Sequence, residues 1–260
     1  ASARNRIGLL EERYRRLLRL AGGVIVKSER MALRLEELGA ERQRIQISPS
    51  GANPALFHGS RPCQSPPLFL AVGRFVAKKG PLLTLRAFQL CLQRADVSPL
   101  PQLWMVGEGP LLAEARRFVV QHQLQNNVVF AGVCSQEQVA ERMRQVRAFV
   151  QHSIVAPDGD SEGSPVAVME AQLSGLPVIA TRHAGIPDVV VDGATGLLVE
   201  EGDVDAMAQA MLTLLAEPML AQKLGEAGQR RALQHFTVEH HLRDVTELLL
   251  RVSSAARALS

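Results

Sequence analysis

The feature that most constrains the fold is a regular alternation of short apolar runs and amphipathic stretches between residues 68 and 216. The apolar runs predict strands buried on both faces of a parallel sheet, and the amphipathic stretches predict helices that cover it. Because crossovers between parallel strands are right-handed, we expect an α/β fold with a Rossmann-like, doubly wound parallel sheet. The strands are expected at 68–74, 102–107, 127–132, 148–152, 177–181 and 196–199, and the helices between them at 81–94, 110–124, 135–145, 164–174 and 203–216.

Shorter elements flank this region on both sides. An arginine-rich helix is expected at 7–21, followed by a strand, a helix that Ser28 can cap, and a second strand at 45–47. Two further helices are expected after Pro218. A run of turn-forming residues indicates a boundary between the two regions. We therefore divide the chain into a first unit at 1–57, a linker at 58–67, the Rossmann-like unit at 68–236 and a C-terminal helix at 237–260.

Composition excludes several classes of function. Hydrophobic residues make up 47% of the chain and charged residues 21%, as in soluble globular proteins. The net charge of +3 is local, since residues 1–50 hold 11 Lys and Arg against 6 Asp and Glu. This distribution, without interleaved aromatic residues, argues against nucleic acid as a partner. The three cysteines form no CxxC pair, which argues against zinc and disulfides. No apolar run reaches about 18 residues, so we expect a cytoplasmic protein.

Ligands of such sheets bind outside the carboxyl ends of the strands, so the residues that follow each strand matter most. After the first strand, Arg74 and Lys79 place two cations within a loop that begins at Gly73. They could bind a diphosphate, or they could form a solvated basic turn. After the second strand, Gly107 and Gly109 form a GxG without the third glycine of a dinucleotide fingerprint. A tight turn before a helix is the favoured explanation, and contact with a ligand is the alternative.

The loop after the fourth strand carries two carboxylates, Glu162 and Glu170, separated by seven residues. With a helix starting near Ser164, Glu170 is expected about two turns in. The amides of Gly163 and Ser164 would form an anion site at the helix N-terminus, and Glu170 could accept bonds from the vicinal hydroxyls of a ribose. An acidic surface loop is the alternative. A calcium loop is disfavoured because Met169 stands where its final glutamate is required.

Histidines offer weaker candidates. His183 follows the fifth strand, close to Gly185, and could make a polar contact, but we expect it on the surface because a lone histidine in a loop is more often a surface residue. His240 and His241 are adjacent on a helix and point in different directions, so they make a poor metal pair. We expect them to be surface or helix-packing residues and expect no metal site.

Four segments taken together resemble the donor domain of family-4 retaining glycosyltransferases of the GT-B fold. They are GRFxxKKG, VGEGP, EGSPVAVMEAxxSGLPVIAT and AGIPDVVxDGxTGLLV, starting at residues 73, 106, 162 and 184. The loop at 156–171 also resembles enzymes of bacterial exopolysaccharide and colanic-acid-type assembly. The resemblance covers about residues 22–236. It implies transfer of a sugar, with retention and without a metal or other cofactor, from a UDP-, GDP- or ADP-linked donor to a glycan or a lipid-linked acceptor.

The resemblance also implies roles for particular residues. Arg74 and Lys79 would bind the diphosphate and stabilise the leaving group, Glu162 would contact the sugar, and Glu170 would contact the ribose. Residues 132–134 would lie beside the base. The full set of predicted donor-binding residues is Gly73, Arg74, Lys79, Gly107, Gly109, Val133, Glu162, Gly163, Ser164, Pro165, Val166, Glu170 and Gly185. Of these, Arg74, Lys79 and Glu162 are expected to act in catalysis.

Departures from the family pattern leave alternatives open. Asp188 stands where the family usually has Glu, and Ser164 where it usually has Phe. Residues 1–57 resemble only the last part of the acceptor-side domain, so a nucleotide-sugar-binding module without transfer activity is a second hypothesis. The basic first helix would either contact anionic lipid or pack against further protein. An epimerase or a phosphorylase would need acid, base or cofactor residues that the sequence does not identify, and the incomplete glycine fingerprint disfavours a dehydrogenase.

Overall fold

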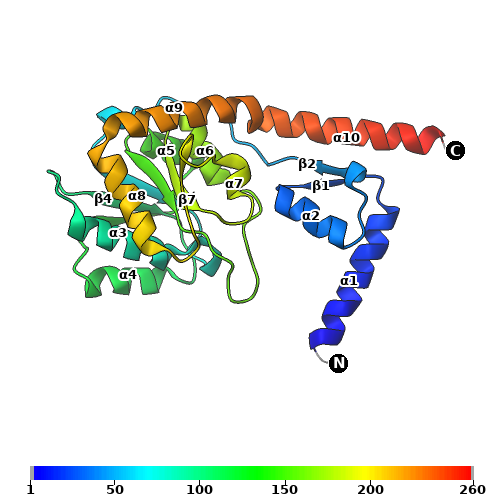
Figure 1. The fold of residues 1–260 in the computed structure, drawn as a ribbon, viewed down its shortest axis with the longest axis horizontal. Helices are drawn as coiled ribbons and strands as arrows, with labels where there is room; N and C mark the ends of the chain where they lie inside the picture. The colour runs from blue at the N-terminus through cyan, green and yellow to red at the C-terminus, as the bar shows by residue number, and fades with distance from the viewer. Residues whose placement is uncertain (1–2, 259–260) are drawn as a thin grey trace.

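The computed structural model describes residues 3–258, and the side chains of residues 11–254. Its main feature is a six-stranded, fully parallel sheet in the order β5-β4-β3-β6-β7-β8 (Figure 1). This order is that of a Rossmann-like doubly wound sheet, with the direction of winding reversed between β3 and β6. The prediction of the fold class is confirmed. The strands are β3 (Leu68–Val72), β4 (Gln102–Val106), β5 (Val128–Gly132), β6 (Ala148–Gln151), β7 (Val178–Thr181) and β8 (Gly196–Val199).

Helices cover both faces of this sheet, and neighbouring residues of one strand pack into different cores. Phe69 of β3 belongs to the core beneath α3, α4 and α8, whereas Leu68 and Leu70 belong to the core beneath α5, α6 and α9. This two-sided burial is why the strands are nearly all apolar. The helices are α3 (Pro81–Arg94), α4 (Leu112–Gln121), α5 (Gln136–Met143), α6 (Val166–Ser174), the short α7 (Ile186–Val189), α8 (Val204–Ala216) and α9 (Pro218–His235).

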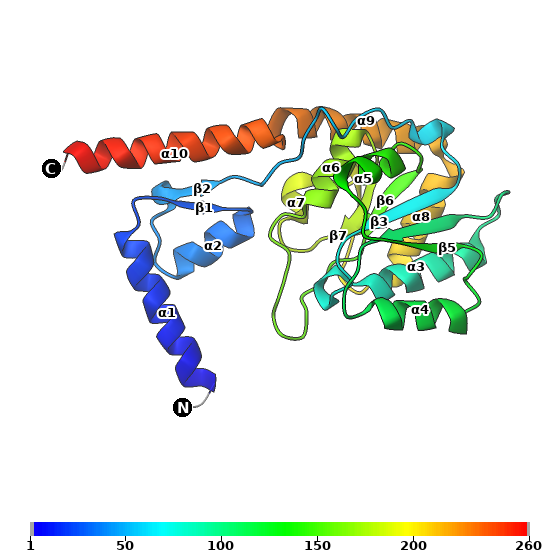
Figure 2. The ribbon, with the colours of Figure 1, turned by 180° about the vertical axis from the view of Figure 1, so that it is seen from behind.

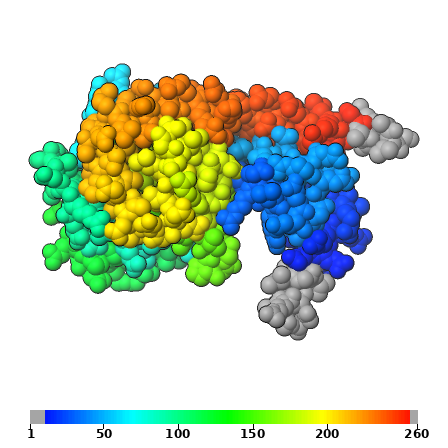
Figure 3. Space-filling model, in the orientation of Figure 1, coloured from blue at the N-terminus to red at the C-terminus, as the bar shows by residue number. Residues whose placement is uncertain are grey.

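The first part of the chain forms a small unit beside the sheet. Its elements are α1 (Ala3–Leu20), β1 (Val24–Val26), α2 (Glu29–Glu37) and β2 (Ile45–Ile47), and β1 pairs with β2 in parallel. As expected, Ser28 caps α2, accepting a hydrogen bond from the amide of Met31 at 3.3 Å. The space-filling view shows this unit against the side of the larger one (Figure 3). The ribbon shows α1 extending away from both (Figure 1).

Two segments connect the units. The segment leading out of β2 crosses the end of α9, where Ala52 exchanges backbone hydrogen bonds with Phe236 and Val238. The last helix, α10 (Val238–Ala258), then runs back over β1 and β2 (Figure 2). The segment at 58–67 packs onto the larger unit, because the Ser60 amide donates to the carbonyl of Ser174 at 2.8 Å. Within the described residues, no helix combines the length and the apolar character that crossing a membrane requires.

Candidate functional site

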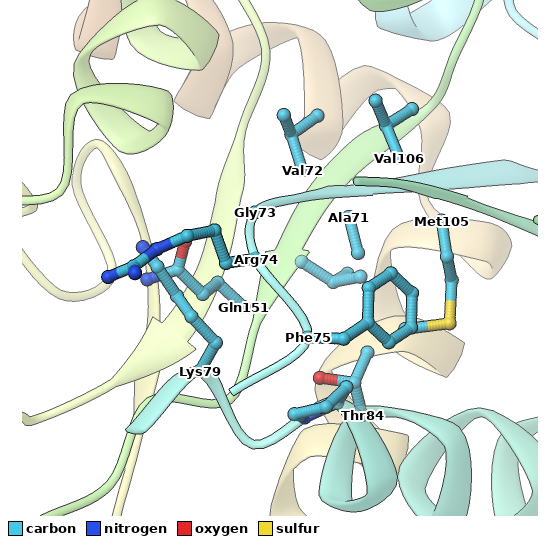
Figure 4. Close-up of a pocket in the computed structure, with 12 residues that line it drawn as sticks. Ala71, Val72, Gly73, Arg74, Phe75, Lys79, Thr84, Met105, Val106 and Gln151 are labelled. Carbon is cyan, nitrogen blue, oxygen red and sulfur yellow. The ribbon is translucent and has the colours of Figure 1, made fainter. Parts of the chain in front are cut away.

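The loop after β3 opens at the point where the winding of the sheet reverses. Gly73 and Arg74 follow β3, and Gln151 ends β6, the neighbouring strand. Together they line a small hollow of about 30 Å³. Figure 4 shows the side chains of Arg74, Lys79 and Gln151 gathered on one side of the strand end. The predicted cations therefore lie where Rossmann-like sheets bind their ligands.

The GxG turn after β4 is explained by close packing of the backbone. A Cβ atom at Gly107 would lie 2.1 Å from the carbonyl oxygen of Gly73, and one at Gly109 would lie 2.6 Å from that of Phe75. Both glycines also have positive φ, 128° and 150°. They bring the loop after β4 against the loop after β3, and this packing needs glycine even without a ligand. Their contact with a donor stays a prediction.

Lys79 is a largely buried cation that lies beside Glu162, one of the two predicted carboxylates, and 16% of its side chain is exposed. A turn of 3₁₀ helix at Ala77–Lys79 directs it inward, and its Nζ lies 3.2 Å from Oε1 of Glu162 and 3.5 Å from Oε1 of Gln151. Burial lowers the pKa of Lys79, and Glu162 acts in the opposite direction. The ammonium group is thus held by one carboxylate in a region of low solvent access.

Glu170, the second predicted carboxylate, is also buried and is 8% exposed. Burial raises its pKa to about 7, while the charge of Lys79 acts in the opposite direction. The helix that carries it begins at Val166, after Pro165, and not near Ser164. Glu170 therefore lies just over one turn into α6, and the expectation of two turns was wrong. The proline fixes φ at the entrance to the helix and delays its start.

Two polar atoms in front of α6 are buried and lack a hydrogen-bond partner among the described residues. They are Oε1 of Glu162 and Oγ of Ser164. Lys79 is near enough to Glu162 for an ion pair, but the angles at Oε1 are not those of a hydrogen bond. Because most buried polar atoms in native proteins are satisfied, two such atoms within three residues of each other in one loop indicate a place that a polar ligand can fill.

The acidic part of the same loop is held by a second lysine. Nζ of Lys78 lies 3.0 Å from a carboxylate oxygen of Asp160 and donates to the carbonyl of Ser161 at 3.2 Å. Among the residues that the structure describes, no three His, Cys, Asp or Glu side chains gather in a way that could hold a metal ion. The adjacent lysines thus have separate partners: Lys78 holds the loop, and Lys79 pairs with Glu162.

The expectation of a surface position for His183 was wrong. Its side chain is fully buried, with Nδ1 2.6 Å from Oε1 of Glu201 and Nε2 3.0 Å from the amide nitrogen of Glu162. Loop position suggested exposure, but these partners come from two distant segments that fold over the histidine. His241 is a helix-packing residue, as expected, since its Nδ1 lies 2.8 Å from the hydroxyl of Ser48.

The small unit reaches the same region. A Cβ atom at Gly185 would lie 2.0 Å from the carbonyl oxygen of Gly163 and 2.7 Å from Cβ of Ser28. The amide of Glu29, at the start of α2, donates to the Asp188 carboxylate at 2.8 Å. Gly163 and Gly185 thus lie where the loops after β6 and β7 meet the small unit.

The structure brings Gly73, Arg74 and Glu162 together around Lys79. Val133 and Val166 lie further out and are 68% and 39% exposed. Sequence reasoning missed Gln151 and Lys78 as well as the burial of His183. Gln151 carried a usable signal, because it is a polar residue at the end of an otherwise apolar strand next to the winding reversal.

Cations and carboxylates at the winding reversal of a Rossmann-like sheet are typical of proteins that bind nucleotides. Residues 56–231, more than half of the chain, match the family of glycosyl transferases group 1. The chain belongs to this family, and its fold is GT-B.

Three similar proteins illustrate the relationship. WcaL of Escherichia coli (strain K12), whose name assigns it to colanic acid biosynthesis as a glycosyltransferase, is 33% identical over 76% of this chain and 48% of its own. AmsK of Erwinia amylovora, an amylovoran biosynthesis glycosyltransferase, is 28% identical over 85% of this chain and 54% of its own. HepE of Anabaena, solved with UDP and glucose, shares the fold with a TM-score of 0.77 at 20% identity, over 92% of this chain and 67% of its own. This chain spans about half the length of the curated relatives it matches.

Proposed function

We propose that this chain provides the donor site of a retaining glycosyltransferase and binds the nucleotide sugar at the carboxyl ends of β3 and β6. The observation that carries the proposal is the position of Lys79, a largely buried cation that pairs with Glu162 and whose charge lowers the pKa of Glu170 against the effect of burial. A departing nucleoside diphosphate gains negative charge as the bond to the sugar breaks. Fixed cations at that position stabilise the transition state more than the ground state. Arg74, exposed at the mouth of the hollow, supplies a second positive charge.

Glu162 and Glu170 then bind different parts of the nucleotide sugar. Glu162 lies in front of α6 with a buried carboxylate oxygen that pairs with Lys79 and accepts no well-aligned hydrogen bond, so it can still accept one from a sugar hydroxyl. Glu170 lies deeper, within α6, and suits the vicinal hydroxyls of a ribose. Since Arg74 and Lys79 supply the charge that a metal ion would otherwise supply, we propose that donor binding does not depend on a metal.

The reaction class is proposed from the family and the relatives. WcaL and AmsK are named for the biosynthesis of colanic acid and amylovoran, so we propose a growing glycan or a lipid-linked sugar as the acceptor. HepE was solved with UDP and glucose, which makes UDP the first nucleotide to test here. The nucleoside diphosphate is the shared product of every donor considered, so it is a suitable probe before the sugar is known.

The deciding experiment is calorimetric titration of the 260-residue chain with UDP, GDP and ADP in the presence of EDTA. We expect saturable binding of one nucleotide, weakened roughly tenfold or more by Arg74→Ala and by Glu170→Ala, since each removes a charged hydrogen-bonding group. Lys223→Ala, an exposed lysine on α9, is the matched control and should bind like the wild type. A folded wild-type chain that binds none of the three nucleotides would overturn the proposal.

We also propose contact between the first helix and an anionic membrane surface. Tyr14, Leu17 and Leu20 of α1 are 51%, 60% and 75% exposed, and the arginines beside them are exposed as well. An exposed helix with apolar and basic residues is suited to the surface of an acidic bilayer, where a lipid-linked acceptor would lie. Sedimentation with vesicles of phosphatidylglycerol should pull down the chain, and vesicles of phosphatidylcholine should not. Equal recovery with both would refute it.

A further inference from the structure

His183 is fully buried yet contacts two polar groups from different loops. Nε2 lies 3.0 Å from the backbone nitrogen of Glu162, and Nδ1 lies 2.6 Å from a carboxylate oxygen of Glu201. A backbone amide can only donate, so Nε2 must accept and carry no proton. The single proton of the neutral ring is then on Nδ1, where it is donated to Glu201. The surroundings therefore select one tautomer of His183.

Glu201 extends this connection to the other end of the loop. One of its carboxylate oxygens faces His183, and the other accepts a hydrogen bond from the amide of Val155 at 2.9 Å. Val155 lies near the start of the loop between β6 and α6, and Glu162 lies near its end. One carboxylate thus holds the loop at both ends, directly at Val155 and through His183 at Glu162.

The backbone beside His183 provides a third contact with the same loop. Ala184 has φ of 49°, a conformation that non-glycine residues rarely adopt. The next residue, Gly185, lies so close to the carbonyl of Gly163 that a Cβ atom would be only 2.0 Å away. The segment 183–185 is therefore shaped to fit both Glu162 and Gly163, and each of these lies at the proposed donor site.

We propose that His183 and Glu201 are positioning residues that fix the loop carrying Glu162, Gly163 and Ser164 in its donor-binding geometry. The proposal rests on the proposed function, because His183 and Glu201 contact the proposed donor site through Glu162. A buried histidine with a defined tautomer can accept on one side and donate on the other, which an apolar side chain of similar size cannot do. Without it, the amide of Glu162 would be buried without an acceptor, and the loop would move to satisfy it.

Two substitutions of His183 distinguish the contact made by Nε2 from the contact made by Nδ1. In His183→Gln the side chain is long enough to present an oxygen near the position of Nε2, so the amide of Glu162 keeps an acceptor. In His183→Asn the amide group reaches only the position of Nδ1, so the contact with Glu201 can persist while the acceptor for Glu162 is lost. Both variants are polar and neutral, so neither adds a buried charge, and each keeps a different one of the two contacts of the ring. Faster exchange at the amide of Glu162 in His183→Asn alone therefore reports the loss of its acceptor.

The first measurement is amide hydrogen exchange in the free chain, read at Glu162 by NMR. Loss of one hydrogen bond should speed exchange roughly tenfold in His183→Asn, with His183→Gln close to the wild type. Long-range nitrogen–proton spectra should show the wild-type ring protonated on Nδ1 alone at neutral pH. A ring protonated on Nε2, or equal exchange rates in the two variants, would overturn the proposal whether or not the chain binds a nucleotide.

The second measurement is calorimetric titration of the same variants with whichever of UDP, GDP and ADP the wild type binds. We expect His183→Asn to bind about tenfold more weakly, since small displacements of positioning groups are costly, and His183→Gln to recover most of that loss. Equal affinity in both variants would refute the positioning role while leaving the donor site intact. Failure of the wild type to bind any nucleotide would instead refute the proposed function, and the exchange rates would still decide the role of His183.

Discussion

Nζ of Lys79 lies 3.2 Å from Oε1 of Glu162, and the two residues are contributed by loops that follow different strands. The pair joins the loop after β3 to the loop after β6 across the winding reversal of the sheet. The charge of the same ammonium group lowers the pKa of Glu170, while burial raises it more strongly. Lys79 is already paired in the free site, so an incoming diphosphate must compete with Glu162 for it.

This competition predicts opposite effects for two substitutions at the ion pair. Glu162→Gln should bind the nucleoside diphosphate about fivefold more tightly, because it removes a repulsion of about 1 kcal/mol between a carboxylate and the phosphates. Lys79→Met should bind it roughly tenfold or more weakly, because it removes a charged hydrogen-bond donor. Both are measured by titration calorimetry, with Lys223→Ala as the control. Weaker binding by Glu162→Gln would show that Glu162 does not oppose the diphosphate.

Because the pKa of Glu170 is raised, we expect the free energy of unfolding to depend on pH. Burial raises its pKa to about 7 in the folded chain, against about 4.3 in an unfolded one. Between these values the folded state keeps a proton that the unfolded state releases, so the free energy of unfolding falls as pH rises toward 7. Glu170→Gln removes this loss, and it should stabilise the chain by about 3 kcal/mol at pH 8 and very little near pH 4.5.

Urea unfolding of the wild type and of Glu170→Gln at both pH values measures this difference. Glu226→Gln, an exposed glutamate on α9, serves as the control and should show no such dependence. The same gain for Glu170→Gln at both pH values would mean that the effect comes from packing and not from ionisation of the carboxyl group.

The sheet was predictable because its signal is local. Each strand is a short apolar run whose burial on both faces follows from composition alone, as Leu68, Phe69 and Leu70 illustrate. The two carboxylates were predictable because they follow a strand at fixed spacing. The contact partner of each side chain could not be predicted from the sequence. Lys79 lies beside Glu162 because β3 and β6 are neighbours in the sheet, and the sequence does not state this strand order. The burial of His183 likewise depends on residues distant in sequence.

We expect a substitution of Gly107 to cost stability through steric overlap as well as through backbone strain. Gly107→Ala combines an unfavourable φ with a Cβ atom 2.1 Å from the carbonyl of Gly73. Gly202→Ala also places alanine at a positive φ, 83°, but its Cβ would meet nothing within 4 Å. We expect losses of about 3 kcal/mol and about 1 kcal/mol in the free energy of unfolding. Chemical unfolding measures both, and equal losses would rule out the packing explanation for the GxG turn.

We expect Asp188, which follows β7, to stabilise the start of α2 in the small unit. Its carboxylate accepts from the amide of Glu29, one of the free donors at the start of α2. Asp188→Ala should destabilise α2 by about 1 kcal/mol, and Asp188→Asn should lose less because it keeps an acceptor. Hydrogen exchange should therefore speed up in residues 29–37 while the strands of the large sheet stay unchanged. The control is Asp205→Ala, which removes an exposed carboxylate in the first turn of α8. If Asp188→Ala leaves exchange in α2 as slow as this control does, the contact does not hold the two units together.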